Sequence, residues 1–245
     1  MAAFLSGPLA VAVRVESRKL VDTRSARCLL FAMILIGLTL IALAAGLSIE
    51  RGGVLDVPVL LMGLALPGAI VAPLLAILSV TSDWQYKDVM TFYALQPRRL
   101  VILGAKYIAV TLFATAVMAA ICLLAVLVAV VLAGFSRVDV VYTGLGQGLW
   151  YATCAVLIGS ISGAAVASAL MSTPLAVVVV LIQSTVADLL IGLVPNIPTA
   201  YVRSSTFSNF LSEGGETLPA LSSAVIWILV PAAVGAWRHR RRDVN

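Results

Sequence analysis

The sequence predicts an all-α membrane protein with six transmembrane helices, and three observations lead to this prediction. First, the chain of 245 residues is 62% hydrophobic and 11% charged, with a mean hydropathy of +1.10, whereas soluble domains carry about 25% charged residues. Second, six apolar stretches are each close to the ~20 residues that a helix needs to cross a bilayer core of about 30 Å. Third, thirteen of the sixteen Lys and Arg residues fall on one side when these stretches are threaded alternately through a membrane. The stretches are residues 28–47, 60–80, 108–133, 145–170, 174–194 and 220–237.

The basic residues also predict the orientation. Loops rich in Lys and Arg stay in the cytoplasm, so we expect both termini inside. The net charge of +5 is explained by this pattern and by attraction to anionic inner-leaflet lipid, so membrane lipid is an expected partner and nucleic acid is not. The inside set is Arg14, Arg18, Lys19, Arg24, Arg27, Lys87, Arg98, Arg99, Lys106, Arg238, Arg240, Arg241 and Arg242, and the outside set is Arg51, Arg137 and Arg203.

The first 27 residues are expected to form a cytoplasmic, interfacial segment, and residues 28–245 the six-span transmembrane domain. Residues 11–27 mix apolar side chains such as Val13 and Leu20 with closely spaced charges. This mixture is typical of a helix that lies in the membrane interface. We therefore expect an elbow, in which an interfacial helix turns into the first span.

Two connections are long enough to contain helices of their own. The inside loop, 81–106, carries aromatic residues among charges and should form one or two short helices, with Pro97 starting a new one. The outside loop, 195–219, contains a half-apolar stretch, 201–211, closed by Gly214 and Gly215. That stretch is typical of a short helix or a re-entrant hairpin against the outer leaflet.

The residues needed for catalysis or for holding a cofactor are missing. The single histidine, His239, lies in the basic tail, so no Ser–His dyad is expected within the membrane. Asp188 is the sole carboxylate in a predicted span, which excludes a two-aspartate site. No phosphate-binding loop and no Cys-x-x-Cys pair occur. We expect no catalytic, cofactor-binding or metal residues, which leaves transport, anchoring or signalling.

The fifth predicted span contains polar residues on an otherwise aliphatic helix, namely Gln183, Ser184 and Asp188. Ser184 and Asp188 are four positions apart and share a helical face. One reading is a polar stripe that faces a substrate path or a partner helix. The other is that Asp188 reaches the outer interface, and the sequence favours neither.

Small residues in the fourth span predict close helix packing. Gly159 and Gly163 form a Gly-x-x-x-Gly face, which lets two helices approach closely. A partner within the same chain is the favoured reading, although a partner chain stays open. In the second span, Pro67 and Pro73 are expected to bend the helix.

Two segments together resemble the permease subunits of type-2 ABC exporters, the family that includes bacterial antibiotic, drug and sodium exporters. Residues 15–30 look like the family's N-terminal elbow, and residues of the inside loop look like its coupling region, although Gln85, Lys87 and Asp88 depart from the family pattern. The matching positions are Glu16, Lys19, Leu20, Thr23, Arg24, Ser25, Asp83, Trp84, Pro97, Arg99 and Lys106.

The resemblance implies a subunit of an ATP-driven exporter in the bacterial cell (inner or plasma) membrane. Such permeases pair with a second, identical or homologous permease, and each docks on a separate ABC ATPase subunit, two per complex, which binds ATP and Mg. This chain itself would bind no cofactor. The expected sites are as follows: for ATPase coupling Asp83, Trp84, Tyr86, Lys87, Asp88 and Phe92; in the elbow Glu16, Lys19 and Arg24; for the substrate path or dimer contact Gln183, Ser184 and Asp188; and for an outer gate Tyr201, Phe207 and Phe210.

Other readings remain open from the sequence alone. The loop aromatics also fit the headgroup belt, where Trp and Tyr are enriched, although their alternation with charges favours docking on a soluble partner. An ATP-independent secondary transporter or channel, or a membrane anchor for a signalling complex, is the alternative function. An apolar path favours lipophilic drugs or lipids as the cargo.

Overall fold

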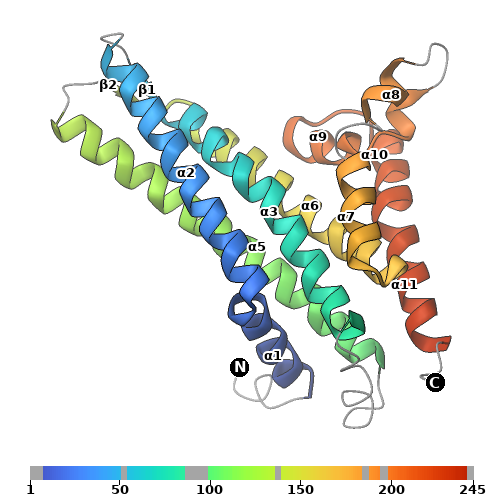
Figure 1. Cartoon of the computed structure of the whole chain (residues 1–245). Helices are drawn as coiled ribbons and strands as arrows, with labels where there is room; N and C mark the ends of the chain where they lie inside the picture. The colour runs from blue at the N-terminus through green and yellow to red at the C-terminus, as the bar shows by residue number, and fades with distance from the viewer. Residues whose placement is uncertain are drawn as a thin grey trace.

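The computed structural model describes residues 8–50, 54–85, 99–135, 139–183, 188–193 and 198–241, and most of these are helical. Figure 1 shows long helices packed side by side, with shorter helices gathered at one end of the C-terminal half. In chain order the elements are α1 (Pro8–Asp22), α2 (Arg24–Glu50), β1 (Val54–Asp56), α3 (Val57–Gln85), α5 (Arg99–Phe135), β2 (Asp139–Val141), α6 (Leu145–Leu170), α7 (Thr173–Leu181), α8 (Asp188–Leu193), η3 (Thr199–Tyr201), α9 (Ser205–Glu213), α10 (Thr217–Ala224), η4 (Val225–Leu229) and α11 (Val230–Arg241).

Five helical runs in the described part of the chain are long and apolar enough to cross a membrane: Arg24–Ala44, Val57–Ser82, Leu100–Gly134, Leu145–Leu170 and Thr217–Arg241. They correspond to the first, second, third, fourth and sixth predicted stretches. The all-α prediction is confirmed at this level, and the helices are compatible with a multi-pass membrane protein. A short parallel pair of strands, β1 with β2, was not expected, and it joins two connections at one end of the bundle.

The stretch expected as the fifth span has a different form. It contains α7, of nine residues, and α8, of six, while residues 184–187 lie outside the described part. At the start of α8, the carboxylate of Asp188 accepts hydrogen bonds from the backbone N–H groups of Ser204 and Ser205. The count of six spans therefore stays a prediction.

The break between the first two helices has a local cause. Thr23 separates α1 from α2, and its Oγ1 accepts a hydrogen bond from the N–H of Ala26 at 3.3 Å. Thr is a favoured residue at this capping position, because its oxygen satisfies an N–H group that has no partner in the first turn. A helix therefore starts at Arg24, four residues before the predicted span.

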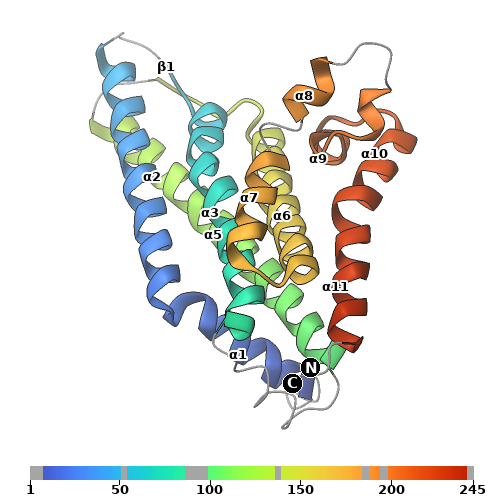
Figure 2. The same ribbon diagram turned by 45° about the vertical axis from the view of Figure 1, so that its right-hand side comes forward.

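Helix α6 lies between α3 and α11 and contacts both (Figures 1 and 2). Its glycine face packs against α3 within the same chain. A Cβ on Gly163 would lie 3.0 Å from the carbonyl oxygen of Pro73, and a Cβ on Gly159 would lie 3.2 Å from the ring of Pro73. The favoured reading of the Gly-x-x-x-Gly face agrees with this packing, and α3 continues as one helix through Pro67 and Pro73.

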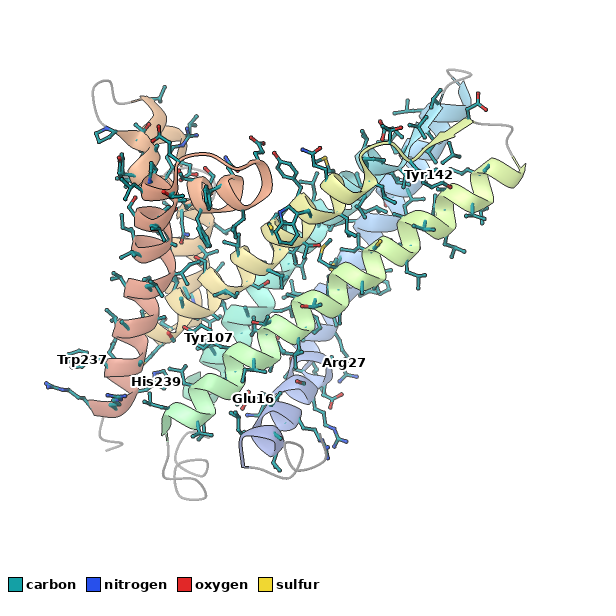
Figure 3. The ribbon with its side chains drawn as sticks, turned by 180° about the vertical axis from the view of Figure 1, so that it is seen from behind. Glu16, Arg27, Tyr107, Tyr142, Trp237 and His239 are labelled. Carbon is teal, nitrogen blue, oxygen red and sulfur yellow. The ribbon has the colours of Figure 1, made fainter. Side chains whose placement is uncertain are left out.

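On its other side, α6 meets the last helix at Gly235. A Cβ at this position would lie 2.0 Å from Ser168 Oγ, so only glycine fits. Ser168 also lies 3.2 Å from the hydroxyl of Tyr107 on α5, and the buried His239 Nδ1 lies 2.8 Å from the Gly235 carbonyl. Figure 3 labels Tyr107 and His239 at the end of the bundle opposite to Tyr142. Three helices are thus joined at one end by small and polar residues.

Candidate functional site

A cavity of about 390 Å³ lies between α3, α6, α7, α9 and the last long helix. Most of its wall is aliphatic, with the Pro73 region of α3 on one side and the glycine face of α6 beside it. The polar side chains of its lining are Ser162, Gln183, Asp188, Ser204, Ser205, Ser208 and Ser223. Clefts with apolar walls and a few placed polar groups are typical of ligand sites, so this cavity is the candidate functional site.

Gln183 supplies the most informative polar group in the cavity. Its side chain is 7% exposed, and its Nε2 donates a hydrogen bond to Ser162 Oγ at 3.1 Å. Ser162 in turn donates to the carbonyl of Trp227 at 3.2 Å, which connects three helical segments. The Oε1 atom of Gln183 is buried and has no hydrogen-bond partner in the described structure. Because buried acceptors are normally paired, this oxygen is available to a donor on a bound molecule.

Asp188 organises the short helices above the cavity. Its two carboxylate oxygens accept hydrogen bonds from the backbone N–H groups of Ser204, at 2.7 Å, and Ser205, at 2.9 Å. These groups stand at the start of α9, where a negative charge is favourable. Ser204 Oγ also donates to the Gln183 carbonyl at 3.3 Å. Asp188 therefore lines the cavity and holds the start of α9 at the same time.

The three aromatic residues expected at an outer gate do not converge. Phe207 lines the cavity with Gln183 and Asp188. Phe210 lines a separate cavity of about 300 Å³, and Tyr201 is 39% exposed. The sequence did not single out Trp227, which lines the main cavity and donates from Nε1 to the Val202 carbonyl at 2.7 Å. Trp227 lies within a predicted apolar span, and nothing in the sequence around it indicates a hydrogen bond to the Val202 carbonyl.

Helix α9 is also fixed to α6. The indole of Trp150 donates to the carbonyl of Leu211, and the hydroxyl of Tyr151 donates to the carboxylate of Glu213. Ser222 and Ser223 on α10 donate to the carbonyls of Tyr201 and Arg203, each at 2.8 Å. The short helices are thus held at one end of the cavity by side-chain hydrogen bonds, most of them to backbone oxygens.

A second polar cluster joins α1 to α3 and α5. Glu16 on α1 lies 2.7 Å from the ammonium group of Lys106 on α5 and 3.3 Å from that of Lys19. Lys106 also donates to the carbonyl of Ser79 on α3 at 2.9 Å. Both side chains of the closer pair are 4% exposed. Arg24, the third predicted elbow residue, is exposed at the start of α2.

The expected coupling residues fall largely outside the described structure. Tyr86, Lys87, Asp88 and Phe92 lie in the undescribed stretch 86–98, as Ser184 lies in 184–187. Asp83 and Trp84 belong to the last turn of α3. The inside loop is shorter than predicted, because residues 81–85 continue α3 and α5 begins at Arg99.

Known proteins add no identification. No family model matches the chain, and no curated protein is similar to it. Within the described ranges, no group of three or more His, Cys, Asp or Glu side chains is placed to hold a metal ion. The arrangement can bind an apolar molecule that carries a hydrogen-bond donor.

Proposed function

We propose that this chain is the membrane-spanning permease subunit of an ATP-driven exporter. It works as a pair with a second permease subunit, on two separate ABC ATPase subunits in the cytoplasm. The proposal combines the resemblance of the elbow and inside-loop residues with the polar cavity. The cargo is a lipophilic drug or lipid, since the cavity wall is mainly aliphatic.

The observation that carries the proposal is the buried ion pair between Glu16 and Lys106. It connects α1 to α5 at 2.7 Å, and Lys106 connects α5 to the Ser79 carbonyl of α3. Helices α3 and α5 flank residues 86–98, where the ATPase is proposed to dock. A movement of that segment is then passed to α1, α3 and α5 together, because a buried pair is costly to separate.

The proposed export path uses the cavity between α3, α6 and α7. In this proposal α7 and α8 form the remaining crossing, which makes six spans and puts both termini in the cytoplasm. The position of α1 and the end of α11 at the same end of the bundle (Figure 2) fits an even number of crossings. A reporter fused to Asn245 is expected to report from the cytoplasm.

The test of ATPase docking is co-purification of the chain with its proposed ABC ATPase partner after the change Trp84→Asp. A charge in place of an aromatic anchor is expected to lower complex recovery about tenfold, since central aromatic residues often contribute 2 kcal/mol or more to an interface. Trp237→Asp is the matched control, because Trp237 is 53% exposed and lies near the end of α11. Undiminished recovery of Trp84→Asp argues against docking at this segment.

A flux measurement separates the proposal from a carrier that works without ATP. The permease in vesicles is expected to move a lipophilic dye only when the ATPase and ATP are both present. Dye flux by the permease alone contradicts the proposal.

A further inference from the structure

The cavity of about 300 Å³ that Phe210 lines is formed by η3, α9 and the start of α10. These elements lie at the end of the bundle away from α1 (Figures 1 and 2). The cavity shares only Ser205 with the proposed export path, and its wall is more polar. Arg203 and Glu216 are the charged residues of its lining, so it contains one charge of each sign.

The guanidinium group of Arg203 lacks a partner. Its Nε atom is buried and has no hydrogen-bond acceptor in the described structure. Among the described residues, no carboxylate forms an ion pair with Arg203, although Glu216 lines the same cavity. Buried N–H groups are normally paired, and the planar fork of a guanidinium matches two oxygens of a phosphate or a carboxylate. An anionic group in the cavity would therefore satisfy Arg203.

Glu216 restricts which anion fits. Its side chain is exposed, and within the described part of the chain it is in no ion pair. A simple anion bound to Arg203 would meet this second negative charge in the same cavity, and like charges repel. A ligand that also carries an ammonium group would pair with Glu216 instead. The two side chains together favour a zwitterion.

The depth of the two charges along the last long helix gives their order. The apolar run that is long enough to span a membrane begins at Thr217, directly after Glu216. Ser223 donates a hydrogen bond to the Arg203 carbonyl at 2.8 Å, and seven residues of helix separate Ser223 from Glu216 by about 10 Å. The backbone of Arg203 thus lies deeper along the apolar run than Glu216. In a zwitterionic phospholipid the phosphate likewise lies deeper than the ammonium group.

The surface beside the cavity favours a lipid over a free zwitterion. Next to Pro219 in the cavity wall, α10 exposes Leu218 at 68% and Leu221 at 59%. These two residues are three positions apart and share a helical face, which Val225, 43% exposed, extends. Acyl chains can lie along this face, whereas a free headgroup gains nothing from it.

From these observations we infer that the cavity binds the phosphoethanolamine headgroup of a membrane lipid. The phosphate lies on the Arg203 guanidinium, the ammonium group lies at Glu216, and the acyl chains follow α10. The site would serve in either leaflet, and the inference does not depend on the export function proposed above.

The test is native mass spectrometry of the full chain in detergent, titrated with phosphatidylethanolamine. Wild-type protein is expected to retain one molecule per chain. Arg203→Gln should weaken binding about tenfold, as expected for the loss of hydrogen bonds to a charged group. Because the Arg203 guanidinium has no described partner, this variant should fold normally. Wild-type affinity in Arg203→Gln overturns the site.

A second lipid tests the role of Glu216. Phosphatidylglycerol has the same phosphate but no ammonium group, so wild-type protein should bind it about threefold more weakly than phosphatidylethanolamine, the small factor being that of an exposed ion pair. Glu216→Gln should abolish this preference by weakening only the binding of phosphatidylethanolamine. An unchanged preference contradicts the pairing of Glu216 with the ammonium group. A variant that had lost its fold would lose both lipids, which separates misfolding from a lost contact.

Three controls complete the test. Arg27→Gln and Asp139→Asn each remove an exposed charge outside the cavity and should leave the retention of both lipids unchanged. Losses equal to those of Arg203→Gln and Glu216→Gln would overturn the site in favour of diffuse surface charge. The third control is water-soluble phosphoethanolamine, which should not displace the lipid at equal concentration. Displacement would overturn the lipid assignment in favour of the free compound.

Discussion

The carboxylate of Glu16 lies 2.7 Å from the ammonium group of Lys106, at a sequence separation of ninety residues. Both side chains are almost fully buried, and each belongs to one of the two segments that resemble the exporter family. The pair fixes α1 against α5 and, through the Ser79 carbonyl, against α3. It therefore sets the position of α1 relative to α3 and α5.

Removing one member of this pair is expected to destabilise the protein strongly. Glu16→Gln leaves the Lys106 charge buried without its counterion, which costs about 3–5 kcal/mol. The measurement is the free energy of unfolding in mixed detergent micelles. In the double variant Glu16→Leu with Lys106→Met, apolar side chains of similar volume should restore most of the lost stability. Equal losses in the single and double variants would show that the contact is not electrostatic.

The junction of α6 and α11 is expected to reject any side chain at Gly235. Gly235→Ala places a methyl group about where Ser168 Oγ now lies, and such overpacking costs roughly 1–3 kcal/mol or more. Thermal unfolding in detergent measures the loss. Gly104→Ala is the matched control, because no atom lies within 4 Å of a Cβ there and alanine in a helix is favoured over glycine by about 0.5–1 kcal/mol. A Gly235→Ala variant as stable as wild type contradicts the packing.

Asp188→Asn is expected to loosen the start of α9. The asparagine side chain keeps one acceptor oxygen but loses the second oxygen and the negative charge. Together these losses at a helix start cost about 1 kcal/mol. Trypsin cleavage after Arg203, the residue before Ser204, should become about fivefold faster when that energy is lost. Asp139→Asn, at an exposed strand residue, should leave the cleavage rate unchanged.

The same variant tests one reading that the sequence left open, in which Asp188 faces a substrate path, against the role in holding α9. If the carboxylate acts only on α9, Asp188→Asn should lower cargo-stimulated ATP hydrolysis by no more than the factor by which it speeds cleavage at Arg203. A loss of stimulation with unchanged cleavage at Arg203 would assign the carboxylate to the cargo instead.

The long helices could be predicted from the sequence because their signal is local. A run of apolar residues such as 145–170 specifies its own length, and the observed α6 has the predicted bounds. The packing face of this helix could also be predicted, because Gly159 and Gly163 are four positions apart and share a helical face. In the structure, Pro73 lies against both glycines. Span boundaries were less accurate: α2 and α5 begin four and nine residues before the predicted spans, since the polar residues there are helical too.

The sites depend on contacts between distant residues, which a single sequence does not encode locally. The partners of Asp188 are backbone N–H groups of Ser204 and Ser205, which have no side-chain signature. The partner of Glu16 was not predictable either, because several basic residues were equally available to it. For the same reason, the hydrogen bond from Gln183 to Ser162 was hidden within a motif interpreted as a packing face.

Gln183→Leu tests whether the cavity selects its cargo by a hydrogen bond. The change removes the bond to Ser162 together with a buried acceptor that has no partner. Losing the hydrogen bond lowers the free energy of unfolding, and removing a buried acceptor without a partner raises it by a similar amount. The free energy of unfolding should therefore change by less than about 1 kcal/mol. The Leu side chain is apolar and offers no acceptor. Export of a lipophilic cargo with a hydroxyl or amide donor should therefore fall about fivefold, as for the loss of one hydrogen bond of ~1 kcal/mol.

The comparison that decides this prediction uses two dyes of similar size, one with a donor and one without, in vesicles that contain this chain and the proposed ATPase. Export of the dye without a donor should be unchanged by Gln183→Leu. Gln147→Leu, at an exposed position outside the cavity, should alter neither dye. Equal losses for both dyes would mean that Gln183 shapes the path rather than recognising cargo, because a change of shape acts on either molecule while a lost acceptor acts only on the donor.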